Sequence, residues 1–282
     1  MSGENPAVYC RDQVRRFDHD RYLTVLFAPP YARARLFALY AFNLEIARVR
    51  EAVREPMIGQ IRLQWWRDAL DEMAQGSVRQ HPVALYLAAA IESAELPRAM
   101  FDRLLEAREF DLAGTPPADL AALEHYADST SATLMALAAA ALGAGGPAVE
   151  AATHHVGIGF ALVGLLRAVP FHARQRRLYL PADRLYATAI DVEALFAGRA
   201  SPALARIAQE IGARAGEHLA LARRIRREVP RAAVPALLPA IVADIYLARL
   251  ARCGYALFDP TILRPAGSRA LRLAIASLLG RY

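Results

Sequence analysis

Apolar residues recur at steps of three and four along nearly the whole chain, a pattern typical of amphipathic helices. In one such stretch Leu36, Leu39, Tyr40, Leu44 and Ala47 fall on a single helical face. No run of β-branched residues alternates with polar ones, so the sequence contains no strand signal. The pattern therefore predicts an all-α protein.

Proline and glycine positions set the expected helix boundaries. We expect helices over about residues 7–18, 30–54 and 61–76, then 82–95 and 98–111. The next should begin at Pro116-Pro117 and end in the glycines near 145. Further helices are expected over about 148–168 (ending at Pro170), 202–227, 237–253 (broken near Pro239) and 268–281. Without a repeat or a linker, these ten to twelve helices predict one bundle-like domain over residues 1–282.

The basic side chains narrow the range of partners. The chain contains no lysine, so all 34 basic residues are arginine, and the net charge is +6. Arginine binds carboxylates and phosphates bidentately, so diphosphates, lipid headgroups and acidic proteins are the favoured partners. Zinc-finger spacing and aromatic RNA-binding signatures are missing, so we expect no nucleic-acid partner.

Cysteine content and hydropathy indicate the compartment. Cys10 and Cys253 are too few and too far apart for a disulfide framework, which favours a reducing environment. The first 16 residues lack the apolar core of a signal peptide. The longest clean apolar stretch, residues 156–166, is too short to span a bilayer. We therefore expect a cytoplasmic protein without a transmembrane helix, in peripheral contact with the inner membrane at most.

Four ordered segments together resemble the squalene/phytoene synthases. They cover residues 37–43, 61–67, 157–167 and 177–181, and the most distinctive are Trp65-Trp66 and the Arg-x-Tyr-Leu-Pro element that begins at Arg177. The resemblance, over about residues 8–260, implies an isoprenoid-synthase-like helical bundle with a central cavity. Those enzymes condense two prenyl diphosphates, and Mg²⁺ held by two Asp-x-x-x-Asp pairs neutralises the leaving diphosphate.

The same resemblance shows that most of the metal-binding carboxylates of the family are replaced in this chain. The two aspartate pairs of the family fall at Ala47 and Glu51 and at Ala168 and His172, so one carboxylate of four remains. Alanine cannot ligate a metal, histidine suits Mg²⁺ poorly, and Arg48 reverses the charge beside the first pair. We therefore expect no metal, no cofactor and no catalytic residue. Mg²⁺ would be needed only if the chain were an enzyme after all.

The segments in which this chain departs from the synthase pattern resemble one subgroup of the family. Segments 43–47, 58–62, 166–170 and 258–260 resemble the synthase-like assembly factors of mitochondrial respiratory complex I. This implies a non-catalytic protein whose partners are complex I subunits or assembly intermediates. Two alternatives stay open: a prenyl transferase whose altered metal site uses Glu45, Glu51, Asp128 and Asp183, and a protein that binds an isoprenoid or a phospholipid.

Seven residues are candidates for lining a cavity or binding an anion there: Arg48, Glu51, Tyr126, Arg167, His172, Arg177 and Tyr179. The alternative for the charged ones is a solvated helix face or an exposed basic loop, and for the tyrosines it is core packing. His154-His155 lacks an evident third ligand for a metal site, so ordinary histidines are expected there.

Overall fold

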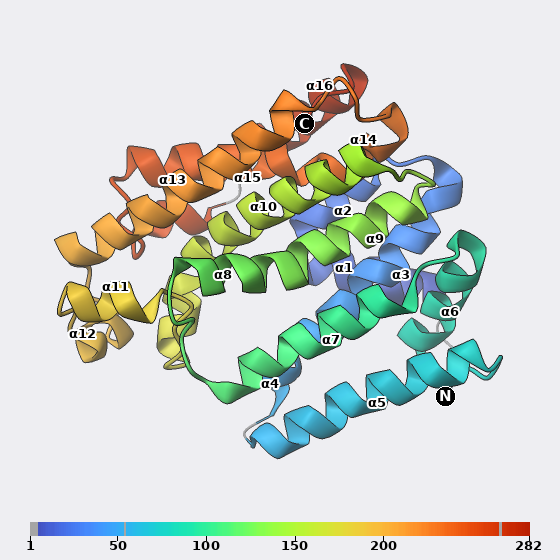
Figure 1. Ribbon diagram of the computed structural model, residues 1–282, viewed down its shortest axis with the longest axis horizontal. Coiled ribbons are helices and arrows are strands. Elements are labelled where there is room, and N and C mark those ends of the chain that lie inside the picture. Colours follow the sequence, from blue (N-terminus) through green and yellow to red (C-terminus); the bar gives the residue numbers. More distant parts are fainter. Residues whose placement is uncertain (1–4, 54, 265–266) are drawn as a thin grey trace.

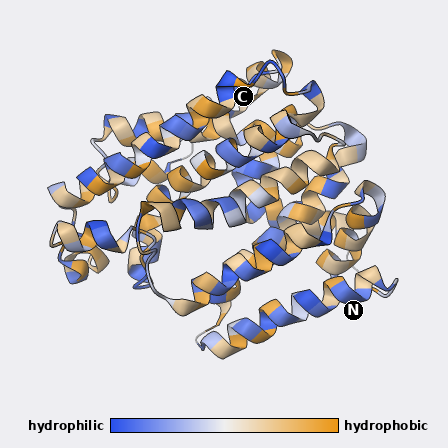
Figure 2. Cartoon of the chain, viewed as in Figure 1, coloured by the Kyte–Doolittle hydropathy of each residue, from blue (hydrophilic) through white to orange (hydrophobic). Residues whose placement is uncertain are grey.

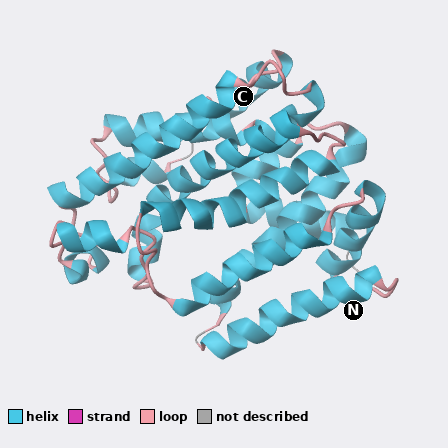
Figure 3. Ribbon diagram, viewed as in Figure 1, coloured by secondary structure: helices cyan, strands magenta, loops and turns pink. Residues whose placement is uncertain are grey.

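The structure is a computed structural model that describes residues 5–53, 55–264 and 267–282. Within these ranges the chain forms helices and loops and no strand (Figure 3). In chain order the elements are α1 (Pro6–Phe17), α2 (His19–Val25), α3 (Pro30–Ala47), α4 (Val49–Ala52), α5 (Pro56–Ala74), α6 (Pro82–Ala94), α7 (Arg98–Ala113), α8 (Leu120–Ala127), η1 (Asp128–Ala132), α9 (Thr133–Ala141), α10 (Pro147–Arg174), α11 (Ala182–Ala187), α12 (Val192–Phe196), α13 (Pro202–Arg224), η2 (Arg231–Ala233), α14 (Val234–Leu237), α15 (Pro239–Arg252), η3 (Pro260–Leu263) and α16 (Arg269–Leu278).

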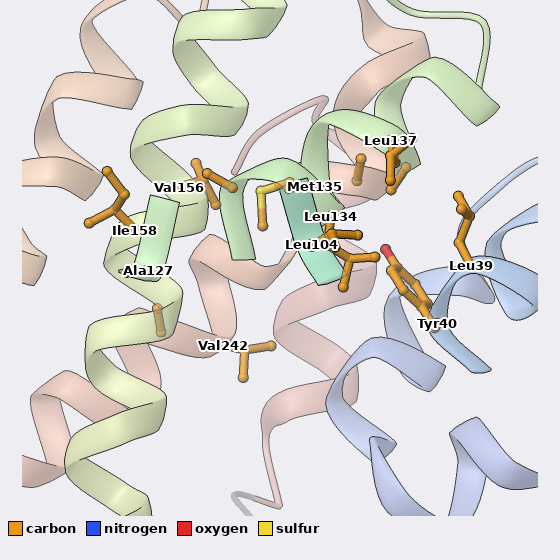
Figure 4. Packing of buried hydrophobic residues seen from close by; sticks show 14 of the residues in the cluster. Leu39, Tyr40, Leu104, Ala127, Leu134, Met135, Leu137, Val156, Ile158 and Val242 are labelled. Atoms are coloured by element: carbon orange, nitrogen blue, oxygen red, sulfur yellow. The ribbon is translucent and has the colours of Figure 1, made fainter. Parts of the chain in front are cut away.

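The 28-residue helix α10 organises the bundle (Figure 1). It packs against α13, α15, α9 and η1, while α3 packs against α1 and α6. Hydrophilic and hydrophobic residues alternate along α5 and α13 (Figure 2), as expected for helices that bury one face. A single cluster of buried apolar residues extends from Cys10 to Tyr282, and Figure 4 shows part of it around Tyr40, Leu134 and Met135.

A π-helical segment interrupts the run from α8 to α9, and the sequence pattern did not predict it. This segment, η1, carries Thr130, whose hydroxyl donates to the Tyr126 carbonyl at 2.7 Å. Its last residue, Ala132, lies directly against Gly157 of α10. Short π-helical insertions shift the register of a helix and are frequent near functional sites. Here the insertion separates the Tyr126 turn from the apolar helix α9.

Several predicted helix boundaries were wrong. The helix expected over 30–54 ends at Ala47. The backbone of Arg48 (φ −94°, ψ 1°) leaves the helical conformation there, and the short α4 follows. The helix expected from Pro116-Pro117 begins at Leu120, because the Asp119 carboxylate caps it by accepting from the Ala122 N–H at 2.8 Å. The sequence pattern also missed α2, α11, α12 and the two short 3₁₀ turns.

Pro170 does not end helix α10, which continues to Arg174. A proline inside a helix costs one hydrogen bond and crowds the carbonyl four residues earlier. Because Pro170 lies near the end of a long, well-packed helix, tertiary contacts outweigh that cost. The extra turn places His172 in the bundle rather than in a loop.

Two segments are apolar and long enough to cross a membrane, Pro147–Arg174 and Arg231–Arg252. The first is longer than the apolar run expected from the sequence. About half of its most apolar window and 72% of the other are buried within the bundle. Burial of this kind is typical of core helices, which pass the same test of length and composition.

Candidate functional site

A cavity of about 490 Å³ lies where α3, α4, α5 and α10 meet α1. Its charged wall consists of Glu45 from α3, Arg48 at the junction of α3 and α4, Glu51 from α4 and Arg62 from α5. Glu45 lies in the last turn of α3, and Arg48 directly follows that helix, so both side chains reach the same cavity. Phe171 from α10 and the adjoining Gln175 also line the cavity.

Charges within this wall compensate each other. The Arg48 Nε lies 3.8 Å from the Glu51 Oε2, and both side chains are about one-third to one-half exposed, so the pair is weak. The Arg48 guanidinium also lies over the ring of Phe17, 4.1 Å from its centre. Two guanidiniums facing two carboxylates leave no excess of negative charge to attract a divalent cation.

The residues at the family's metal positions do not fit a Mg²⁺ cluster. Ala47 and Ala168 carry no ligand atom, Glu51 is engaged by Arg48, and His172 packs in a different part of the bundle. Within residues 5–53, 55–264 and 267–282, no three His, Cys, Asp or Glu side chains converge on one point in a way that could hold a metal ion. Mg²⁺ prefers several oxygen ligands in octahedral geometry.

A second group of candidates meets around the buried carboxylate of Asp111. The hydroxyls of Tyr126 and Tyr179 both donate to its Oδ1, at 2.8 and 2.7 Å. Arg108 approaches the other oxygen at 3.3 Å and donates to the Tyr126 hydroxyl at 2.8 Å. Burial, together with the Asp111 charge, raises the pKa of Tyr179, so this phenol stays protonated and continues to donate.

His172 contributes to the same group through ring packing. Its ring centre lies 4.6 Å from that of Tyr179. Burial lowers the pKa of His172 to about 4, and the nearby positive charge of Arg177 acts in the same direction. The ring is therefore neutral at pH 7. Arg177 lies at the edge of the group, where it lines a small hollow with Asp111 and Tyr179.

Arg167 lies in a third place, between α10, α15 and α2. Its guanidinium lies 3.3 Å from the ring centre of Tyr246 and 3.6 Å from the Asp20 carboxylate. Arg269 of α16 also donates to Asp20, so a buried and a partly buried arginine share one carboxylate. Burial lowers the pKa of Arg167. The Nε atoms of both arginines are buried and find no acceptor within the described part of the chain.

The structure thus distributes the seven candidates over three places. Arg48 and Glu51 line the cavity, Tyr126, Tyr179, His172 and Arg177 surround Asp111, and Arg167 lies beside Asp20. Sequence reasoning missed Asp111, Arg108, Asp20 and Arg269. The three-residue spacing of Arg108 and Asp111 on one helix was the only signal for the first two, and the neighbouring Glu106 and Glu109 obscured it.

Of the four carboxylates proposed as alternative metal ligands, only two lie at the cavity. Glu45 and Glu51 share its wall. Asp128 instead accepts from His154 and Arg103, at 2.7 and 2.5 Å. Asp183 is paired with Arg184 at 2.6 Å.

The adjacent His155 also has a protein partner. Its Nδ1 lies 3.0 Å from the Nδ1 of His218, so one imidazole donates a hydrogen bond to the other and links α10 to α13. The bonded arrangement of His154 and His155 supports ordinary structural roles for both.

Comparison with known proteins identifies a matching family and several relatives of this chain. The family model described as squalene/phytoene synthase matches residues 14–271. A Bos taurus protein named NADH dehydrogenase (ubiquinone) complex I, assembly factor 6 is 30% identical over 97% of this chain and 82% of its own length. A phytoene synthase of Cereibacter sphaeroides is 28% identical over 67% of this chain and 55% of its own length.

A solved dehydrosqualene synthase superposes with a TM-score of 0.84 over 97% of this chain and 95% of the other, at 18% identity. That likeness confirms the predicted all-α, isoprenoid-synthase-like bundle. Together with the family match over most of its length, it leads to one conclusion: the chain belongs to the squalene/phytoene synthase family.

Proposed function

We propose that this chain is a non-catalytic member of the family that assists the assembly of respiratory complex I. The observation that carries the proposal is the wall of the cavity, where Arg48 and Arg62 face Glu45 and Glu51. Ionisation of a prenyl diphosphate needs concentrated positive charge from metal ions, and those ions need several converging carboxylates. The near full-length relatives named as complex I assembly factor 6 support the assembly role.

The fold is shared with a solved dehydrosqualene synthase, so the fold by itself does not distinguish an assembly factor from an enzyme. Subunits or assembly intermediates of complex I are the proposed partners. Function depends here on the site and its surface rather than on the fold, because one fold hosts many activities.

Gene deletion in the native host tests the assembly role. Loss of the protein should lower the amount of assembled complex I and its NADH-oxidising activity, while carotenoid and hopanoid levels stay normal. Complementation with the wild-type gene and with a Glu51→Ala variant should both restore complex I, because no reaction depends on this carboxylate. Normal complex I with altered isoprenoids would reject the proposal.

The alternative of an altered transferase has its own test. Purified protein is incubated with farnesyl or geranylgeranyl diphosphate and Mg²⁺, and released pyrophosphate is measured. We expect release no faster than in a protein-free control. Turnover that disappears in the Glu45→Gln/Glu51→Gln variant would show that the cavity carboxylates hold metal and that the chain is an enzyme.

A lipid in the cavity is a second candidate role. The volume of about 490 Å³ lies within the range of small-ligand sites, and Arg48 and Arg62 could bind a phosphate oxygen. Native mass spectrometry of gently purified protein would reveal a retained isoprenoid or phospholipid. Protein that carries no such mass would count against this role and leave the assembly role intact.

A further inference from the structure

Helix α16 exposes an apolar stripe on the surface of the bundle. One face of the helix is buried through Arg269, Leu273 and Ala276. On the other face Leu271 is 64% exposed and Leu278 is 79% exposed, with Ile275 between them. The helix lies at the edge of the molecule, close to the C-terminus (Figure 1). Large apolar side chains in line on an exposed helix indicate an interaction surface.

The charge around this stripe is strongly positive. From residue 245 to residue 282 the sequence has one acidic residue, Asp259, and six arginines, of which Arg269 is buried against Asp20 and the other five remain to charge the surface. The arginine-rich segment 223–231 adjoins the other end of the helix, where the Arg223 Nε donates to the Tyr282 carbonyl at 3.2 Å. Arginines therefore flank the apolar stripe at both ends.

A basic groove of about 310 Å³ runs between α15 and α16. Arg249, Arg252 and Arg272 line it with Ser268, and no described lining residue is acidic. Arg249 is held by the backbone carbonyl of Thr261 at 3.1 Å. Arg252 and Arg272 are exposed and keep most of their donors free for an anion. Guanidinium groups placed in this way bind phosphate oxygens through charge-assisted hydrogen bonds.

We propose that α16 and this groove dock the protein on the surface of an anionic lipid bilayer. Leu271, Ile275 and Leu278 enter the boundary between headgroups and acyl chains, and the arginines of the groove bind headgroup phosphates. An amphipathic helix with basic flanks binds a membrane by adding apolar burial to electrostatic attraction. This proposal does not depend on the proposed role in complex I assembly, because that role was argued from the residues of the cavity wall and not from α16.

Charge favours a bilayer over a protein partner. A protein would need an acidic surface at both ends of a short apolar stripe, whereas an anionic bilayer offers negative charge on all sides of it. The apolar segment next to α16, residues 231–252, is 72% buried in its most apolar window, so the exposed stripe of α16 is the part of this region that can enter the membrane.

Vesicle flotation tests the proposal with the full-length protein. The probes are vesicles of phosphatidylcholine alone and of phosphatidylcholine mixed with phosphatidylglycerol. We expect binding to the anionic vesicles that weakens as salt is added. The Leu271→Gln/Leu278→Gln and Arg252→Gln/Arg272→Gln variants should each lose on the order of tenfold in vesicle partitioning. All four positions are exposed, so thermal unfolding should stay at the wild-type temperature.

Matched controls use equally exposed residues elsewhere. Met57→Gln/Ile61→Gln removes an exposed apolar pair from α5, and Arg11→Gln/Arg206→Gln removes two exposed arginines. Both controls should bind vesicles like the wild type. Equal binding to neutral and anionic vesicles, no binding to either, or a loss confined to the control variants would overturn the proposal. In the second case the stripe would instead be a protein contact.

Discussion

At the scale of single residues, Asp111 determines how the polar interior is arranged. Its carboxylate accepts from Tyr126 and Tyr179 and compensates the charge of Arg108. A buried charge without such partners costs several kcal/mol. These four side chains therefore stabilise the fold only together. Without the Asp111 carboxylate, both tyrosines would lose their hydrogen-bond acceptor and Arg108 would lose its counter-charge.

Replacement of Asp111 by Asn should lower the free energy of unfolding by about 3 kcal/mol, because Arg108 then carries a buried, uncompensated charge. Urea unfolding followed by circular dichroism measures this. The control is Asp102→Asn, whose carboxylate is 46% exposed and pairs with Arg98 at 2.9 Å. That change should cost less than about 1 kcal/mol, and similar losses in both variants would contradict the assigned role.

His172 should make stability fall in acid. Its folded pKa of about 4 lies below the usual value near 6.5, so between these values the unfolded chain binds a proton that the folded chain does not. The stabilisation is complete above pH 6.5 and is lost as the pH falls toward 4. Burial lowers the pKa of His155 and His218 as well, which adds to the same trend.

A His172→Phe variant should flatten this profile by about 2 kcal/mol between pH 7 and pH 4. The measurement is the urea midpoint at a series of pH values. The exposed His125, replaced by Gln, serves as the control and should leave the slope unchanged. A wild-type slope in the His172 variant would show that other groups carry the acid sensitivity.

At the scale of elements, contact between α10 and η1 depends on the absence of a side chain. A Cβ at Gly157 would lie 2.3 Å from the Cα of Ala132, and backbone on both sides cannot move away. This close approach fixes the π-helical segment against the longest helix of the bundle. It also explains why a helix-weakening glycine is tolerated there.

Gly157→Ala should therefore lower the free energy of unfolding by about 2 kcal/mol or more through overpacking. Gly164, one more glycine of α10, has no neighbouring atom where its Cβ would be. Gly164→Ala should raise stability by up to about 1 kcal/mol, because alanine favours helix. Thermal unfolding of the two variants compares them directly, and a shift in the same direction for both would argue against close packing at Gly157.

At the scale of the whole molecule, Tyr282 at the C-terminal end packs into the core of the bundle. The Tyr282 side chain is 2% exposed, and its hydroxyl donates to the Ala222 carbonyl of α13 at 3.2 Å. Tyr282→Ala should cost about 3 kcal/mol of unfolding free energy, whereas Arg281→Ala, at an exposed position, should change it little. Equal stability of the two variants in urea would show that the terminus is not part of the core.

Local pattern was sufficient for much of the fold. The steps of three and four predicted helices, and prolines marked the starts of α3, α6 and α13. The ordered Trp-Trp and Arg-x-Tyr-Leu-Pro segments indicated the family, which the comparisons confirm. The pattern failed at Pro170 and at η1, where tertiary packing outweighs the local preference of the residue.

The sequence by itself determined that the metal positions of the family are largely lost, since two of the four are alanines and one is a histidine. A side chain without a ligand atom cannot hold Mg²⁺ in any fold. Only the tertiary structure decided where the other candidates lie. It brought Asp111 of α7 to Tyr126 and Tyr179 and brought Arg269 of α16 to Asp20, across separations of up to 249 residues. Such contacts depend on how helices pack, and packing is set by the shape of the whole core rather than by any local pattern.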